Sequence, residues 1–241
     1  MLPELFLLVP LASAFKLPSP QYIFGNPSPD TSATYRIPTV HESAVQARRI
    51  LQLESIATLS TVFPSGKDTS AGTLENRPSD VEGAPIGLMD YYADCSPQPG
   101  DPTILAITIA TSFKNVAEGS NITLSLRWHP PHGAFHSAAA LPRFSLLGHI
   151  EPLSEEEVSS AGVTPCFLKH HPDAVAWLPG NRIHESKWVR LVVEEVYWIG
   201  GFGDRAYIGW IPIETWRSIT QEEIEKVRLP GEGWRIMGWE L

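Results

Sequence analysis

Residues 39–63 read TVHESAVQARRILQLESIATLSTVF, and this stretch decides the fold class. Thr39 followed three residues later by Glu42 is a capping box, a pattern that starts helices. Apolar residues then recur at intervals of four, three and four, which places them on one stripe of a helix: Val40, Ala44, Ala47 and Leu51. The sequence therefore predicts a helix up to Ser55, with Arg48 and Arg49 mostly away from the buried stripe.

A strand pattern replaces the helix pattern after Ser55. β-Branched residues are frequent in 56–63, and the alternation places one set on a common face: Ala57, Leu59, Thr61 and Phe63. Most of the further strand candidates are bounded by Gly, Pro or Asn: Ala84–Tyr92, Thr103–Ala110, Asn121–Trp128, Arg143–Glu151, Trp188–Ile199 and Ala206–Ile211. So many short strands with few helices predict a mainly β, α+β fold, an antiparallel barrel and not a βαβ sheet.

Three further helices are expected between and after these strands. Capping boxes begin at Ser154 and at Thr220, and a stretch from Pro165 to His171 ends before Pro172. The glycine-rich run at 200–203 lies between two predicted strands and no helix follows it, so we interpret it as a hairpin or barrel corner.

The N-terminal residues have the pattern of an export signal. An apolar run at 5–11 precedes Ala12-Ser13-Ala14, a small-x-small cleavage site, which predicts a signal peptide over residues 1–14. Residues 15–38 contain five prolines and no apolar period, and we expect an extended Pro-rich leader there. A single domain then spans 39–241. The chain is expected to be secreted or to lie in the lumen of the secretory pathway.

The composition of the chain argues against nucleic acid and the membrane interior as partners. The formal net charge of −9, without a basic cluster, argues against nucleic acid, and no apolar run is long enough to span a membrane. Asn121-Ile122-Thr123 is an N-glycosylation acceptor. Cys95 and Cys166 are an even pair. From the sequence they are either one disulfide of an oxidising compartment or two free, buried thiols.

Few residues have the pattern of a metal, catalytic or phosphate-binding site. His129, His132 and His136 lie in a loop without a carboxylate or cysteine to complete a metal site, so they are interpreted as solvated. His170-His171 ends a helix, where a cation complements the dipole. No hydrolase nucleophile motif is present. Thr111, Ser112, Lys114 and Asn115 follow a strand and open a helical turn. They are either a phosphate cradle or a simple helix start with a solvated lysine.

Several of these segments resemble one known family, the CREG-like proteins. The residues that carry the resemblance lie at 47–51, 56–61, 85–87, 171–174 (His-Pro-Asp-Ala) and 197–203, which ends in Gly-Gly-Phe-Gly. The family is named for a cellular repressor of genes stimulated by a viral early protein. It is a branch of the pyridoxamine 5′-phosphate oxidase-like split barrels, and the similarity covers about residues 41–220.

This resemblance implies a six-stranded split β-barrel, a homodimer, and flavin mononucleotide (FMN) at the dimer interface in catalytic relatives. Ser112-Phe113-Lys114 is similar to the Ser-x-Lys that contacts the flavin phosphate in those relatives. They also carry an Arg and a Lys on the second strand, where this chain has Pro85–Asp90 and no cation. We therefore expect a binding module without turnover. The alternatives are an FMN-dependent oxidoreductase, in which Asp90 would lie beside the phosphate, and a haem binder with a histidine ligand.

Overall fold

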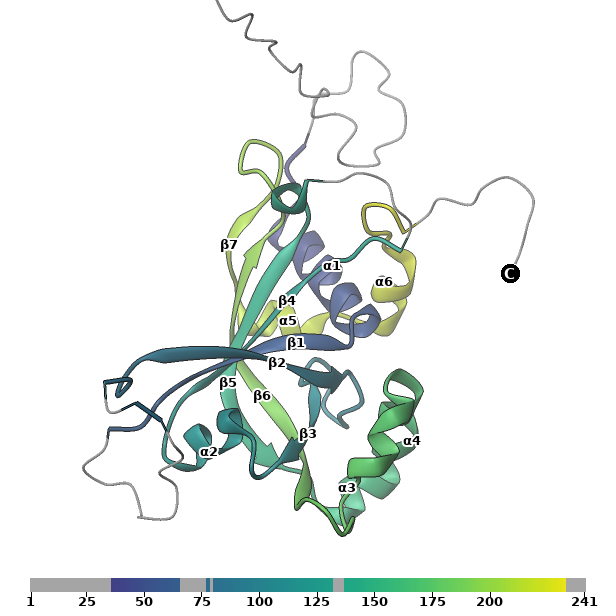
Figure 1. The fold of residues 1–241 in the computed structure, drawn as a ribbon. Coiled ribbons are helices and arrows are strands. Elements are labelled where there is room, and N and C mark those ends of the chain that lie inside the picture. Colours follow the sequence, from purple (N-terminus) through teal and green to yellow (C-terminus); the bar gives the residue numbers. More distant parts are fainter. Residues whose placement is uncertain (1–35, 66–76, 79, 132–136, 233–241) are drawn as a thin grey trace, which may run out of the picture.

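The computed structural model describes residues 36–65, 77–78, 80–131 and 137–232 (Figure 1). The predicted signal peptide at 1–14 lies outside these residues. So do His132, His136 and all of the predicted leader except residues 36–38. Within the described part, no helix is both long enough and apolar enough to cross a membrane.

Seven antiparallel strands form one sheet that closes on itself. They are β1 (Ile56–Val62), β2 (Pro85–Ala93), β3 (Thr103–Ile107), β4 (Ile122–Arg127), β5 (Arg143–Pro152), β6 (Ser186–Ile199) and β7 (Ile208–Ile211). The strand order is β3-β2-β1-β4-β5-β6-β7, and β3 also pairs with β6. The first six strands therefore close a barrel and β7 is an extra strand on β6. This confirms the predicted six-stranded antiparallel barrel.

Short helices cover the ends of the barrel. They are α1 (Val40–Leu53), α2 (Thr111–Ala117), α3 (Glu155–Ser160), α4 (Val163–His170), α5 (Ile213–Ser218) and α6 (Gln221–Lys226), with 3-10 turns η2 (Ala138–Ala140) and η3 (Pro172–Trp177). Figure 1 shows α1, α5 and α6 grouped together, and α3 and α4 at the opposite end of the molecule. All three predicted capping boxes are present, at Thr39, Ser154 and Thr220.

The first helix forms as predicted but buries one residue that we expected elsewhere. Ala44, Ala47 and Leu51 are fully buried, in agreement with the apolar stripe. Arg48 is also buried, with 2% of its surface exposed. Its position was wrongly predicted because its partners come from the segment after β2 and from α5, which the helix pattern cannot indicate.

Several predicted strands are shorter in the structure, β3 and β7 among them. β3 ends at Ile107, since the backbone N–H of Ala110 turns back to the carbonyl of Ile107. β7 begins at Ile208, two residues later than expected. Residues 200–207 connect β6 to the antiparallel β7, so the glycine-rich run belongs to a hairpin, as predicted.

A β-bulge on β6 changes the orientation of two acidic side chains. Leu147 pairs with Glu195 and Gly148 pairs with Val193, so Glu194 is an extra residue between them. Simple alternation would place Glu194 and Glu195 on opposite faces, yet both are exposed. Gly148 is required there because a Cβ atom would lie 1.9 Å from the carbonyl oxygen of Val192.

Two hydrophobic cores stabilise this arrangement. The larger core fills the barrel with inward residues such as Leu59, Leu124 and Leu146, and it continues under α1, α5 and α6. The smaller core lies beneath α3, α4 and η3, where Phe167 packs against Trp188. The α3–α4–η3 segment is thus packed separately from the main core.

Candidate functional site

The predicted phosphate cradle lies at the start of α2, directly after β3. Ser112 and Asn115 are buried, with 3% and 4% of their surfaces exposed, whereas Thr111 and Lys114 are partly exposed. The amide of Asn115 donates a hydrogen bond to Thr61 Oγ1 at 3.0 Å. Asn115 is therefore attached to β1 and Ser112 is buried, so that of these four residues Thr111 and Lys114 are the ones that reach the surface.

The second strand supplies no positive charge to this place. β2 contains no Lys or Arg, and the part of it that pairs with β1 near Thr61 is Pro85, Ile86 and Gly87. Flavin phosphate is recognised mainly by charge-assisted hydrogen bonds. β2 therefore adds no cation to Ser112 and Lys114, and these two residues by themselves fit a phosphate dianion poorly.

Asp90 does not lie where we expected it. It pairs with Ala57, while Thr61 beside the cradle pairs with Ile86, four residues further along the strand. Four residues of a strand span roughly 13 Å, so Asp90 lies at the other end of β2. Burial raises the pKa of its carboxyl group, and the backbone N–H of Tyr91 opposes this by donating to Oδ1 at 2.8 Å.

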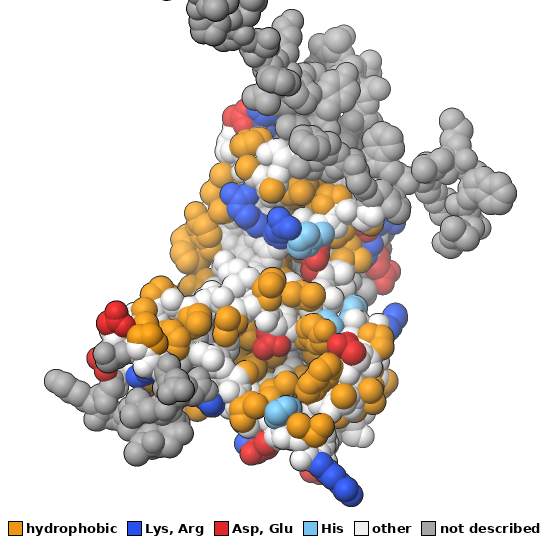
Figure 2. All heavy atoms as spheres, viewed as in Figure 1, with side chains coloured by type: hydrophobic (Ala, Val, Ile, Leu, Met, Phe, Trp, Pro, Cys, Tyr) orange, Lys and Arg blue, Asp and Glu red, His pale blue; other side chains and the backbone are white. Residues whose placement is uncertain are grey.

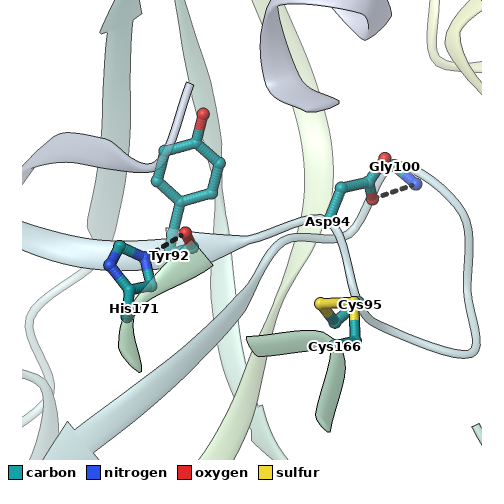
Figure 3. Close-up of a disulfide and its surroundings, with 6 residues drawn as sticks. All are labelled: Tyr92, Asp94, Cys95, Gly100, Cys166 and His171. Atoms are coloured by element: carbon teal, nitrogen blue, oxygen red, sulfur yellow. Dashed lines mark hydrogen bonds between the residues drawn. A yellow bond between two sulfur atoms is a disulfide. The ribbon is translucent and has the colours of Figure 1, made fainter. Parts of the chain in front are cut away.

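His171 is a buried structural residue. Its Nε2 donates to the carbonyl oxygen of Tyr92 at 2.9 Å, as Figure 3 shows, and its ring stacks on Tyr91 with 4.1 Å between ring centroids. The Tyr91 hydroxyl donates to Asp173 Oδ2 at 3.0 Å. The His-Pro-Asp-Ala segment at 171–174 thus attaches η3 to β2. His170 is the last residue of α4, and burial lowers its pKa.

Cys95 and Cys166 form a disulfide that joins the segment after β2 to α4 (Figure 3). Their Cα atoms are 5.9 Å apart, and 71 residues separate them in the sequence. Cys95 belongs to the smaller core. The disulfide therefore fastens the α3–α4–η3 segment to the barrel.

His129 is held by partners that the loop composition did not indicate. Its Nδ1 lies 2.9 Å from Glu54 Oε2, and its backbone N–H donates to Glu54 Oε1 at 2.6 Å. Arg127 Nε donates to His129 Nε2 at 2.6 Å. His129 is still 52% exposed outside the strands, as expected for a solvated loop histidine, but the sequence did not indicate its carboxylate partner. Glu54 is 75 residues away in the sequence, so only the fold brings the two together. No group of His, Cys, Asp and Glu in the described ranges could hold a metal ion.

Comparison with known families agrees with this geometry. The family described as "CREG, beta-barrel" matches residues 38–218, about three quarters of the chain. This chain belongs to the CREG family. No curated protein sequence matches this CREG protein.

One solved structure shares the fold at low sequence identity, and two others are less similar. A heme binding protein from Mycobacterium smegmatis superposes with a TM-score of 0.54 and 18% identity, over 76% of this chain and 61% of that protein. A protein of unknown function from Agrobacterium tumefaciens gives a TM-score of 0.49 and 20% identity, over 80% of this chain and 64% of that one. ChuZ from Campylobacter jejuni gives a TM-score of 0.48 and 15% identity, over 72% of this chain and 61% of that protein. The CREG chain thus spans about three fifths of these proteins.

Proposed function

We propose that this CREG protein is a binding module without catalytic turnover. The observation that supports this proposal is the lack of Lys and Arg on β2, the strand that carries phosphate-binding cations in the flavin-binding relatives. In addition, Asn115 uses its amide to contact Thr61. A phosphate held by few charge-assisted hydrogen bonds binds weakly, so FMN would not remain bound at cellular concentrations. Fold alone does not transfer the flavin chemistry of the wider superfamily to this chain.

The absorption spectrum of the purified protein tests this proposal. We expect protein produced through a secretory route to be colourless, and to show no saturable change when FMN is added. Lys114→Ala is the matched variant, because Lys114 is the cation in the Ser-x-Lys pattern. Yellow wild-type protein that loses its flavin in Lys114→Ala would instead establish the FMN-dependent oxidoreductase. A Soret band would indicate the haem alternative, which the similarity to the mycobacterial heme binding protein makes worth testing.

We also propose that the protein is a secreted or luminal glycoprotein and a homodimer. Asn121 is exposed immediately before β4, as an acceptor for an oligosaccharide must be. On the outer face of β1 and β2, Ile56 and Met89 are 52% and 80% exposed, and exposed apolar patches of this kind favour association with a second copy.

The mass of the exported protein tests both statements. We expect the subunit mass to fall on N-glycosidase treatment, and to equal the unmodified mass in Asn121→Gln and Thr123→Ala. Thr123→Ser keeps the acceptor triplet and is the control. Light scattering is expected to give twice the subunit mass. An exported chain with an unmodified mass would contradict the glycan, and a monomeric mass would contradict the dimer.

A further inference from the structure

Two arginines face each other at one end of the barrel. Arg127, the last residue of β4, pairs directly with Arg143, the first residue of β5. Like charges directly opposite each other destabilise an antiparallel pair. Over the described ranges, neither arginine forms an ion pair with a carboxylate. The chain carries a formal charge of −9, so this local positive charge stands out against an acidic molecule.

Both guanidinium groups are held in place. Arg127 Nε donates to His129 Nε2, so that nitrogen carries no proton and Nδ1 is the one that donates to Glu54. Arg143 Nη1 donates to the carbonyl oxygen of Ala139 at 3.3 Å. Arg127 is anchored through Nε. Its two terminal nitrogens have no acceptor within the part of the chain that the structure describes, so they can bind a ligand. An ordered cation loses little entropy when it binds a ligand.

The cross-strand partners two residues away from Arg127 and Arg143 form a polar and aromatic surface on the same face of the sheet. Residues two apart on a strand share a face, and the next row contains Ser125, Ser145, Tyr197 and Trp210. The two serine hydroxyls are 2.8 Å apart. The Tyr197 and Trp210 rings meet edge to face at 5.0 Å, and Trp210 is 53% exposed.

Figure 2 shows this part of the surface from outside. Basic side chains gather beside a histidine at the border of a hollow that is almost uncharged, with apolar side chains on its other sides. By the register of β4 to β7, the paired serines lie next to the two arginines, and Tyr197 and Trp210 follow them on the same face.

We propose that this hollow binds a small amphipathic acid. Its carboxylate, phosphate or sulfonate group lies between Arg127 and Arg143, and its apolar ring system lies over the serines against Trp210. Arginine forks match such anionic groups bidentately, and the aromatic side supplies apolar contact area. This proposal rests on the function as a binding module and names the class of ligand. The site is separate from the start of α2, where flavin phosphate would bind.

Two fluorescent probes that differ by a single acidic group test the site. Anilinonaphthalene sulfonate carries an anion on an aromatic body, and phenylnaphthylamine is the same ring system without the sulfonate. We expect the wild-type protein to bind the sulfonate at least about tenfold more tightly than the neutral amine, since charge-assisted hydrogen bonds are the stronger kind. Inorganic phosphate is expected to compete with the sulfonate only.

Single variants locate the binding. Arg127→Gln and Arg143→Gln are each expected to weaken sulfonate binding at least about tenfold and to leave the neutral amine unaffected. Trp210→Ala is expected to lower the affinity for both probes. Arg182→Gln, an exposed arginine in the segment before β6, is the control and should change neither. The thermal midpoint of the arginine variants should stay equal or rise, because a like-charge pair is removed.

The outcomes separate this proposal from the proposed function. Equal affinity for the two probes, absent sulfonate binding, or arginine variants that bind the sulfonate normally would overturn the anion site. FMN binding that depends on Lys114 and not on Arg127 or Arg143 would overturn the proposed function and leave the anion site intact if the sulfonate results hold.

Discussion

Replacement of Arg48 by methionine is expected to lower the free energy of unfolding by about 3–5 kcal/mol, because it leaves a buried carboxylate without its partner. Arg48 Nη2 lies 3.8 Å from Asp94 Oδ2, and both side chains are almost fully buried. The guanidinium also lies 5.2 Å from the centre of the Trp216 ring and donates to the Trp216 carbonyl at 3.4 Å. The pair therefore connects α1 to α5 and to the segment after β2.

This loss should depend on pH. Burial raises the pKa of Asp94, and the charge of Arg48 partly offsets that increase. Without Arg48 the pKa rises further, so at acid pH Asp94 is protonated and its neutral form costs less to bury. A carboxyl group whose pKa is raised on folding contributes stability below its unfolded pKa, and this is lost as pH rises through the folded value. The deficit of Arg48→Met is therefore largest at neutral pH.

Urea denaturation at acid and at neutral pH measures both effects. Arg48→Met combined with Asp94→Leu should recover part of the loss, since replacing both members of a buried pair is far less harmful than removing one. Lys226→Met, which breaks an exposed pair with Glu222, is the control and should cause a much smaller change. A deficit that is the same at both pH values would show that lost packing, and not the stranded charge, explains the effect.

The local elements of this fold could be predicted from the sequence because their signals are local. The capping box at Thr39 and the alternation of Ala57 and Leu59 need only neighbouring residues to be recognised, and both are present in the structure. The antiparallel barrel follows from many short strands with short connections. The glycine-rich run at 200–203 indicated the hairpin that places β7 on β6, whereas the closing contact between β3 and β6 was not specified by these patterns.

Long-range partners explain what the sequence could not indicate. Arg48 is buried because Asp94 and Trp216 surround it, and His129 is anchored because Glu54 ends α1 nearby. Neither arrangement leaves a signal in spacing or composition. The opposed arginines were missed for a similar reason, since Arg127 and Arg143 become neighbours only through the register of β4 and β5.

Removal of the disulfide is expected to lower the free energy of unfolding by about 4 kcal/mol. Cys95 and Cys166 are 71 residues apart, and cross-linking a loop of this length restricts the unfolded chain by about that amount in the chain-entropy model. The variant to use is Cys95→Ala with Cys166→Ala, which avoids leaving one reactive thiol. Wild-type protein treated with a thiol reductant in denaturant should show the same deficit.

The loss should also be localised, because the disulfide attaches one particular part of the molecule. α3, α4 and η3 pack on their own small core, in which Cys95 lies near Phe167 and Trp188. Hydrogen exchange is expected to accelerate in 155–177 of the double variant while β1, β4 and β5 keep their protection, since local opening has its own free energy. Uniform acceleration over the whole barrel would contradict a separately packed segment. A double variant within about 1 kcal/mol of wild type would contradict the chain-entropy estimate.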